Sequence, residues 1–214
     1  MIQSLVFSAL FLSSASAGYY GGGGKRPGNG GGGGNSGNRG CESGWMRFNR
    51  PSGEWCVRVF GGHMDQAAAE RRCRSVGATL SGVQNSQEIN QITRSALRVI
   101  TSQHSGSVWI GAKRTSSCNG QILTRSCTTR NSFYWTDSST TGTAGFVWEQ
   151  NQPDNAHSRS QNCAILLASS TPSVTVKEVT WRANHLDDVG CSVANMDAVT
   201  PRKILGYVCG KRSR

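Results

Sequence analysis

The sequence of 214 residues lacks the short motifs that mark common classes of enzyme. It contains no Gly-x-Ser-x-Gly nucleophile elbow, no His-Glu-x-x-His zinc motif and no phosphate-binding P-loop. Its histidines stand in unrelated contexts (His63, His104, His157 and His185). A lone histidine is more often structural or at the surface than catalytic. We therefore predict a protein that is not an enzyme.

No stretch is both apolar enough and long enough to cross a bilayer, which takes about 20 residues. The one apolar run, from Ile2 to Leu12, is too short, and the small residues from Ser13 to Ala17 follow it as a cleavage signal. We interpret residues 1–17 as a secretory signal peptide, although no lysine or arginine precedes the apolar run. The mature protein is then expected to be soluble and secreted, with no membrane insertion.

The cysteines lack the spacing of a structural zinc site, since no Cys-x-x-Cys pair is present. No Asn-x-Ser/Thr site for N-glycosylation is present either. There are eight cysteines (Cys41, Cys56, Cys73, Cys118, Cys127, Cys163, Cys191 and Cys209). An even number in a secreted chain predicts four disulfides, but eight cysteines allow 105 pairings, so spacing alone does not fix the connectivity.

Charge and composition divide the rest of the chain into two parts. Residues 18–40 are mostly glycine and are expected to be a flexible segment, while residues 41–214 are long enough for one domain with a real core. The net charge is +11; three of these charges lie in the glycine-rich segment, which leaves +8 on the domain. Such a charge favours acidic partners such as anionic glycans, or serves solubility alone. Secretion argues against nucleic acid.

Hydrophobic spacing predicts two helices in the domain. The first is expected over residues 66–76, with Asp65 as its N-cap and Gly77 just beyond its end. Apolar residues at helical spacing over 89–100 predict the second helix, which Ser86 is expected to cap.

Strands and one long loop are predicted around these helices. Strands are expected in a hairpin within 41–59 and at 108–112, 133–135, 163–167, 174–181 and 204–209. The ten residues from Cys118 to Cys127 form a polar loop that a local disulfide could tie. Residues 136–162 form a long, mostly polar loop, and such loops are usually functional. The fold class is therefore α+β.

Two stretches offer the oxygen ligands that calcium prefers. Residues 149–155 contain Gln152-Pro153-Asp154, and a second acidic pair, Asp187-Asp188, lies just before Cys191. Calcium takes about 6–8 oxygen ligands, and a cis bond before Pro153 would turn Gln152 and Asp154 to the same side of the chain. The alternative interpretation is an ordinary polar turn, because Asn, Gln, Pro and Asp are all turn residues.

Taken together, these motifs resemble the C-type lectin-like domain family over residues 41–210. The residues that carry the resemblance come in the family's order: Cys73, Trp109-Ile110-Gly111, Gln152-Pro153-Asp154, Asn162-Cys163, Asp187-Asp188-Val189-Gly190-Cys191 and Tyr207-Val208-Cys209. The resemblance implies two helices with small antiparallel sheets and a long loop region. It also implies the disulfides Cys73–Cys209 and Cys163–Cys191, with Cys41–Cys56 as the N-terminal bridge of the family's long form and Cys118–Cys127 as a local pair.

The resemblance further implies a calcium site that also binds sugar. The resemblance makes Gln152, Asp154, Asp187 and Asp188 calcium ligands, and Gln161 stands where the family has a glutamate. It also makes Gln152, Asp154 and Asp187 the residues that bind the sugar. The Gln-Pro-Asp order accompanies galactose-type binding in the family. Leu186 replaces the family's tryptophan, and the loss of a carboxylate at Gln161 predicts weak calcium binding.

A sugar site also needs a flat apolar face, and Trp148 is the candidate for it, the alternative being a core tryptophan.

Two functions follow as hypotheses. The first is a secreted, calcium-dependent lectin for galactose-type sugars; by analogy with the family it would act in pathogen recognition in innate immunity. The second is a calcium-independent interaction or extracellular-matrix domain that binds proteins or polyanions through its basic surface. The intact Gln152-Pro153-Asp154 favours the first, while Gln161 and Leu186 favour the second. The sequence leaves the oligomeric state open.

Overall fold

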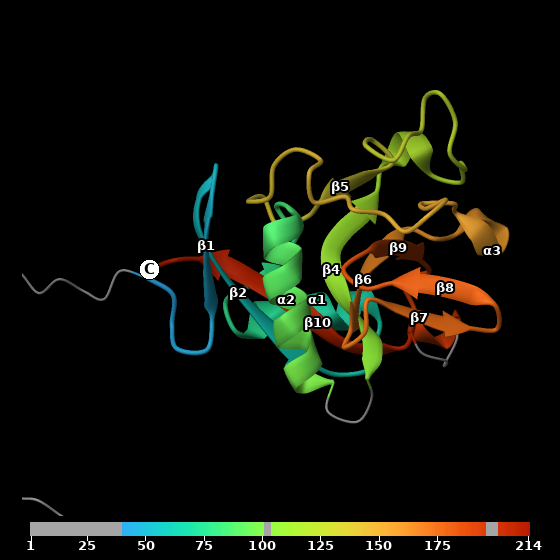
Figure 1. The fold of residues 1–214 in the computed structure, drawn as a ribbon. Coiled ribbons are helices and arrows are strands. Elements are labelled where there is room, and N and C mark those ends of the chain that lie inside the picture. Colours follow the sequence, from blue (N-terminus) through green and yellow to red (C-terminus); the bar gives the residue numbers. More distant parts are fainter. Residues whose placement is uncertain (1–39, 101–103, 196–200) are drawn as a thin grey trace, which may run out of the picture. The chain divides into compact units, whose positions relative to one another are not determined.

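The computed structural model describes residues 40–100, 104–195 and 201–214 (Figure 1). The predicted signal peptide and nearly all of the glycine-rich segment lie outside the described residues. Among the residues described, no helix is long and apolar enough to cross a membrane.

The elements follow one another in the order of an α+β domain. Their bounds are β1 (Met46–Arg50), β2 (Gly53–Gly61), α1 (Gln66–Ser75), β3 (Thr79–Leu80), α2 (Ser86–Val99), β4 (Ser105–Arg114), a 3-10 turn (Ser116–Cys118), β5 (Phe133–Trp135), α3 (Ala156–Arg159), β6 (Cys163–Ser169), β7 (Ser173–Val176), β8 (Val179–Arg182), β9 (Leu186–Val189), a second 3-10 turn (Val193–Asn195) and β10 (Ile204–Arg212). The fold class predicted from the sequence is confirmed.

Eight strands form one sheet with the order β1-β2-β10-β4-β6-β9, to which β3 adds beside β10 and β5 beside β4. The contact between β10 and β4 is parallel, and the other pairs in this sheet are antiparallel. The first and last described residues lie close together, because Gly40 donates its N–H to the carbonyl of Arg214 over 3.0 Å. β7 and β8 form a separate two-stranded hairpin.

The core is split by the sheet, and β4 shows how its sequence produces the split. Val108 and Ile110 belong to the cluster that packs against α2, whereas Trp109 belongs to the cluster that contains Ala69 and Cys73 of α1. Successive side chains of a strand point to opposite faces. A continuous run of apolar residues in β4 is therefore buried on both sides, and the buried residues of α1 and α2 belong to different clusters.

The helix ends differ in detail from those predicted. α1 has Asp65 as its N-cap residue, but the carboxylate of Asp65 accepts hydrogen bonds from Val193 N (2.7 Å) and Ser192 Oγ (2.9 Å) and not from the helix. The predicted cap of α2 at Ser86 is wrong by one residue, since Asn85 is the N-cap and accepts from Glu88 N over 3.0 Å. Gly77, with φ +68°, ends α1 as predicted.

The segment predicted as one strand from Val174 to Trp181 is instead the hairpin of β7 and β8. Lys177 and Glu178 form its turn with φ values of 48° and 67°. Two consecutive positive φ values are typical of the type I′ hairpin turn, which usually uses asparagine, aspartate or glycine. Lysine and glutamate are not of that kind, so the turn could not be predicted from its residues.

All eight cysteines are paired within the described residues. The disulfides are Cys41–Cys56, Cys73–Cys209, Cys118–Cys127 and Cys163–Cys191. These are the pairs implied by the resemblance, so that expectation is confirmed. The second bridge joins α1 to β10, and the fourth joins the start of β6 to the residues after β9.

A buried ionic network fixes the first part of the long loop. The guanidinium of Arg50 donates to Glu88 of α2 over 2.7 Å and to Asp137 over 3.1 Å. Asp137 in turn accepts the N–H of Gly82 over 2.8 Å. The network ties β1, α2 and the loop together and leaves the later part of the loop, residues 142–162, to be held by other contacts.

Candidate functional site

The Gln152-Pro153-Asp154 tripeptide lies in the later part of the long loop. The bond between Gln152 and Pro153 is cis, and the side-chain oxygen of Gln152 accepts the N–H of Asp154 over 2.9 Å. One carboxylate oxygen of Asp154 accepts the N–H of Ala156 over 2.9 Å. Both side chains are half-buried. The tripeptide is thus held partly by its own short-range hydrogen bonds.

Asp188 of β9 anchors this loop to the sheet. Its Oδ1 accepts the N–H of Asp154 over 3.0 Å, and its Oδ2 accepts the N–H of Asn155 over 2.9 Å. The same Oδ2 forms an ion pair with Nη2 of Arg114. The side chain of Asp188 is fully buried, so both of its oxygens are engaged inside the protein.

Arg114, at the end of β4, supplies the positive charge in this cluster. Its side chain is 1% exposed. Its Nε donates to the carbonyl of Gln161 over 2.9 Å, and its guanidinium lies over the ring of Phe133 at 4.7 Å from the centroid. Sequence reasoning missed Arg114, because no local pattern links it to Asp188, 74 residues further along the chain.

Burial shifts the pKa of both partners against ionisation. It raises the pKa of Asp188 to about 6, and the charge of Arg114 opposes this rise. It lowers the pKa of Arg114, which the charge of Asp188 opposes in turn. Each group therefore depends on the other to stay charged in a buried place.

Asp187 does not share this cluster with Asp188. The two residues are neighbours in β9, so their side chains face opposite sides of the sheet. Nε of Arg202 lies 2.9 Å from Oδ2 of Asp187, but the N–H does not point at this oxygen as a hydrogen bond requires. Both carboxylate oxygens of Asp187 are buried, and neither has a hydrogen-bond partner among the described residues. Burial raises the pKa of Asp187 to about 8, against the opposing charge of Arg202.

The predicted calcium ligands, arranged in this way, do not fit a calcium ion. Asp188 is already engaged by three donors, Asp187 faces the other side of β9, and the side-chain oxygen of Gln161 is buried. Calcium needs about 6–8 oxygens around one point. Within the described part of the chain, no three His, Cys, Asp or Glu side chains gather in a group that could hold a metal ion.

Trp148 does not offer the sugar-binding face that its position in the loop suggested. It is 9% exposed and packs against Phe133 and Phe146, with ring centroids 5.0 and 5.6 Å away. Its Nε1 donates to the carbonyl of Thr129 over 2.8 Å. The indole is therefore part of the core, which was the alternative interpretation of its sequence.

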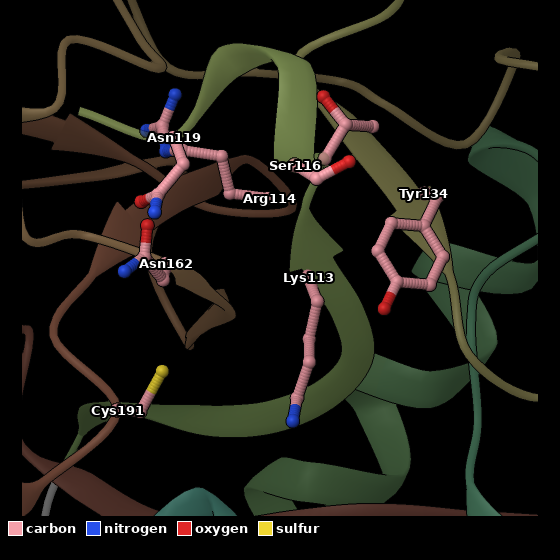
Figure 2. Close-up of a pocket in the computed structure, with 8 residues that line it drawn as sticks. Lys113, Arg114, Ser116, Asn119, Tyr134, Asn162 and Cys191 are labelled. Atoms are coloured by element: carbon pink, nitrogen blue, oxygen red, sulfur yellow. The ribbon is translucent and has the colours of Figure 1, made fainter. Parts of the chain in front are cut away.

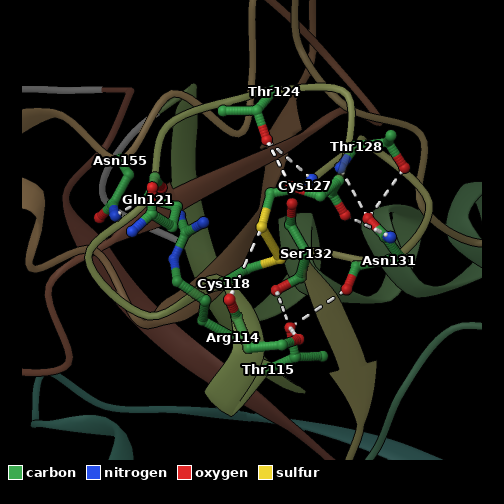
Figure 3. Close-up of a disulfide and its surroundings, with 12 residues drawn as sticks. Arg114, Thr115, Cys118, Gln121, Thr124, Cys127, Thr128, Asn131, Ser132 and Asn155 are labelled. Carbon is green, nitrogen blue, oxygen red and sulfur yellow. Dashed lines mark hydrogen bonds between the residues drawn. A yellow bond between two sulfur atoms is a disulfide. The ribbon is translucent and has the colours of Figure 1, made fainter.

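The loop closed by Cys118–Cys127 also supports the long loop (Figure 3). The carbonyl of Gln121 accepts Nδ2 of Asn155 over 2.8 Å, and Oδ1 of Asn155 accepts the N–H of Gln161 over 2.9 Å. Asn155 has φ 52°, a left-handed conformation that asparagine tolerates better than most residues. Hydrogen bonds from the disulfide loop thus continue through Asn155 to the residues just before β6.

Comparisons with known proteins identify the family and the fold. The family described as C-type lectin domain-containing protein 141/158 matches residues 46–212. Three solved structures share the fold. The first is the carbohydrate-recognition domain of cow CD23, determined in the presence of an oligosaccharide, with a TM-score of 0.52 and 16% identity over 82% of this chain and 98% of that chain. The second is herring type II antifreeze protein, with a TM-score of 0.51 and 18% identity over 81% of this chain and 100% of that chain. The third is human lithostathine, with a TM-score of 0.50 and 15% identity over 80% of this chain and 90% of that chain.

Proposed function

The chain belongs to the C-type lectin domain-containing protein 141/158 family, which is non-enzymatic. From this membership we propose that it is a secreted carbohydrate-binding domain, and from the ion pair between Arg114 and Asp188 that it works without calcium. In this proposal residues 1–17 are a signal peptide, 18–40 a flexible glycine-rich segment and 41–214 the lectin domain. The four disulfides support secretion, because such bonds persist in oxidising compartments.

One observation carries the calcium-independent part of the proposal, namely that Arg114 already neutralises Asp188. Freeing Asp188 for an ion would leave Arg114 buried without its partner, at a cost of about 3–5 kcal/mol. A weak extracellular calcium site, at ten times its Kd, returns only about 1.4 kcal/mol of stability. Arg114 therefore wins the competition, and it does for the loop what calcium would otherwise do.

Carbohydrate is the ligand class that the family and the charge favour together. The carbohydrate-recognition domain of cow CD23, which shares this fold, was determined in the presence of an oligosaccharide. The domain, residues 41–214, carries a net charge of +8. A basic surface raises the local concentration of anionic ligands, so anionic glycans are the expected partners.

A second candidate is a calcium-dependent lectin for galactose-type sugars, with Gln152, Asp154, Gln161, Asp187 and Asp188 as ligands. The observation in its favour is that Gln152, Asp154 and Asp188 do lie in one hydrogen-bonded cluster. It requires Arg114 to leave Asp188 when the ion binds.

A glycan array separates the two candidates. The secreted domain is applied once with millimolar calcium and once with a chelator. We expect the same glycans to bind equally in both, with anionic glycans the strongest. Loss of binding with the chelator, together with a preference for galactose over mannose, would favour the second candidate. Binding to every polyanion alike, removed by salt, would indicate a basic surface with no sugar site.

A further inference from the structure

A hollow opens beside the end of β4, and its lining includes neither Gln152 nor Asp154. Its volume is about 530 Å³, which is within the range of about 300–1,000 Å³ that small-molecule sites occupy. Its lining is Lys113, Arg114, Thr115, Ser116, Asn119, Tyr134, Asn162 and Cys191. We call it the Lys113 pocket. Figure 2 shows the amides of Asn119 and Asn162 on one side of it and Tyr134 on the other.

The strands aim two unlike side chains into this pocket. Lys113 is the one exposed residue of β4, all others in that strand being buried. It lies directly opposite Tyr134 of β5, so both side chains stand on the same face of the sheet. Tyr134 is 48% exposed, whereas its neighbour Phe133 points into the core. The half-exposed ring of Tyr134 thus lies beside Lys113, the exposed residue of an otherwise buried strand.

The charge of the pocket is of one sign. Among the residues that the structure describes, its charged lining residues are Lys113 and Arg114, and no Asp or Glu lines it. No carboxylate among the described residues lies within ion-pair distance of Lys113, while the guanidinium of Arg114 is taken by Asp188. Among the described residues of the pocket, Lys113 is therefore the cation that is not neutralised by an ion pair.

The opposite wall supplies polar groups held in place by the backbone. The carbonyl of Asn162 accepts the N–H of Arg114 over 3.0 Å, which fixes the residue. Its side-chain oxygen is buried and has no hydrogen-bond partner among the described residues. Buried polar atoms are normally paired, so the amide of Asn162, a half-buried residue of the pocket lining, has a hydrogen bond to gain from a ligand hydroxyl that reaches it. Asn119 follows the 3-10 turn that the Cys118–Cys127 bridge holds.

We propose that the Lys113 pocket binds an acidic sugar residue, one that carries a carboxylate or a sulfate ester. Lys113 pairs with the acidic group, the ring of Tyr134 covers the apolar face of the sugar, and Asn162 and Asn119 bond its hydroxyls. The proposal deepens the proposed function, on which it rests, by giving it a site that uses neither Gln152 nor Asp154.

Matched sugars test the proposal directly. Methyl glucuronide carries a carboxylate where methyl glucoside carries a hydroxymethyl group, and the two are otherwise alike. Galactose 6-sulfate tests whether a sulfate ester is bound. Each is titrated into the isotope-labelled domain and followed by NMR, in the presence of a chelator. We expect one or both acidic sugars to shift the amide signals around Lys113, Tyr134 and Asn162, and the glucoside to bind at least about tenfold more weakly.

Two pairs of variants locate the binding. Lys113→Gln should weaken the acidic sugar about tenfold, whereas the control Lys177→Gln, in the exposed turn of the β7–β8 hairpin, should change nothing. Tyr134→Ala should weaken binding while Tyr134→Phe, which keeps the ring, should preserve most of it. If Lys113→Gln binds acidic sugars as the native domain does, or loses no more than Lys177→Gln, the pocket proposal is overturned and the proposed function still stands. A domain that binds no glycan on the array overturns the function itself.

Discussion

Arg114 and Asp188 form an ion pair between β4 and β9 in which both side chains are almost completely buried, at 1% and 0% exposure. The pair joins the centre of the sheet to its edge, and Asp188 also holds the long loop through two backbone N–H groups. Buried charges are costly unless each is paired and hydrogen-bonded. The loop's shape therefore depends on this pair, and four predictions follow from it and from its surroundings.

Removing one member of the pair should be far more damaging than removing a surface charge. Arg114→Gln should lower the free energy of unfolding by about 3–5 kcal/mol, because Asp188 is left as an uncompensated buried charge. Chemical denaturation measures the loss.

The control is Arg47→Gln, since Arg47 pairs with Glu54 at 57% and 31% exposure; an exposed pair contributes at most about 1 kcal/mol. The double variant Arg114→Gln/Asp188→Asn should lose less than the sum of its two single changes. Equal, small losses for Arg114→Gln and Arg47→Gln would show that the buried pair does not hold the loop.

Asp187 should make the protein less stable as pH rises. Burial raises its pKa from 3.8 to about 8 in the folded protein, so between about pH 4 and pH 8 the folded state binds a proton that the unfolded state has lost. The stability that this proton brings is complete below about pH 4 and disappears as pH passes through 8.

Asp187→Asn keeps the neutral shape and removes the titration. The variant should match the native domain near pH 4 and exceed its stability by about 1 kcal/mol or more near pH 8. Denaturation curves at several pH values give the comparison. A stability difference that does not change with pH would mean that Asp187 is ionised in the folded protein.

Trp148 should act as a core residue. Trp148→Ala should cost about 3–5 kcal/mol of unfolding free energy, in the range of large-to-small changes in a core. Trp148→Phe should cost less, and it should leave the affinity for acidic sugars unchanged. A folded Trp148→Phe variant with native stability but weakened sugar binding would restore the ligand-contacting role that its burial argues against.

The Cys118–Cys127 bridge should matter more for the Lys113 pocket than for global stability. It spans 9 residues, against 136 for Cys73–Cys209, and loop-closure entropy assigns about 3 and about 5 kcal/mol to loops of such lengths. The double variant Cys118→Ser/Cys127→Ser should therefore fold, yet bind methyl glucuronide more weakly because Asn119 is no longer fixed. Unchanged binding would exclude Asn119 from the site.

Cys73 and Arg114 show which structural features could be predicted from the sequence and which could not. Cys73 could be placed because it lies on the inner face of a helix with clear signals at both ends, and because the family pattern gave its partner. Arg114 ends a buried strand, next to Lys113, and nothing nearby in the sequence indicates a carboxylate from β9. Charge pairing across 74 residues is decided by sheet order, which local patterns do not encode.

Trp148 and the acidic pair show the same limit at the site. The residue types at Asp187 and Asp188 suggested a shared ion, but they could not tell that both positions belong to a strand, where neighbours face opposite ways. Trp148 was placed in a loop that the hydrophobic pattern could not divide into core and surface. The Lys113 pocket was not predicted, because its lining comes from the end of β4 and the turn after it, from β5, and from the residues just before β6 and just after β9. These segments meet only in the folded protein.

Calorimetric titration of calcium into the native domain and into Arg114→Gln tests the central claim most directly. The account predicts no binding heat for the native domain at millimolar calcium, because Arg114 already occupies Asp188. In Arg114→Gln the charge that competes with calcium for Asp188 is gone. If this variant remains folded, any binding heat for calcium is expected from it and not from the native domain. Saturable calcium binding to the native domain with a Kd of about 10⁻⁴–10⁻³ M, abolished by Asp188→Ala, would contradict the account and establish the calcium-dependent lectin in its place.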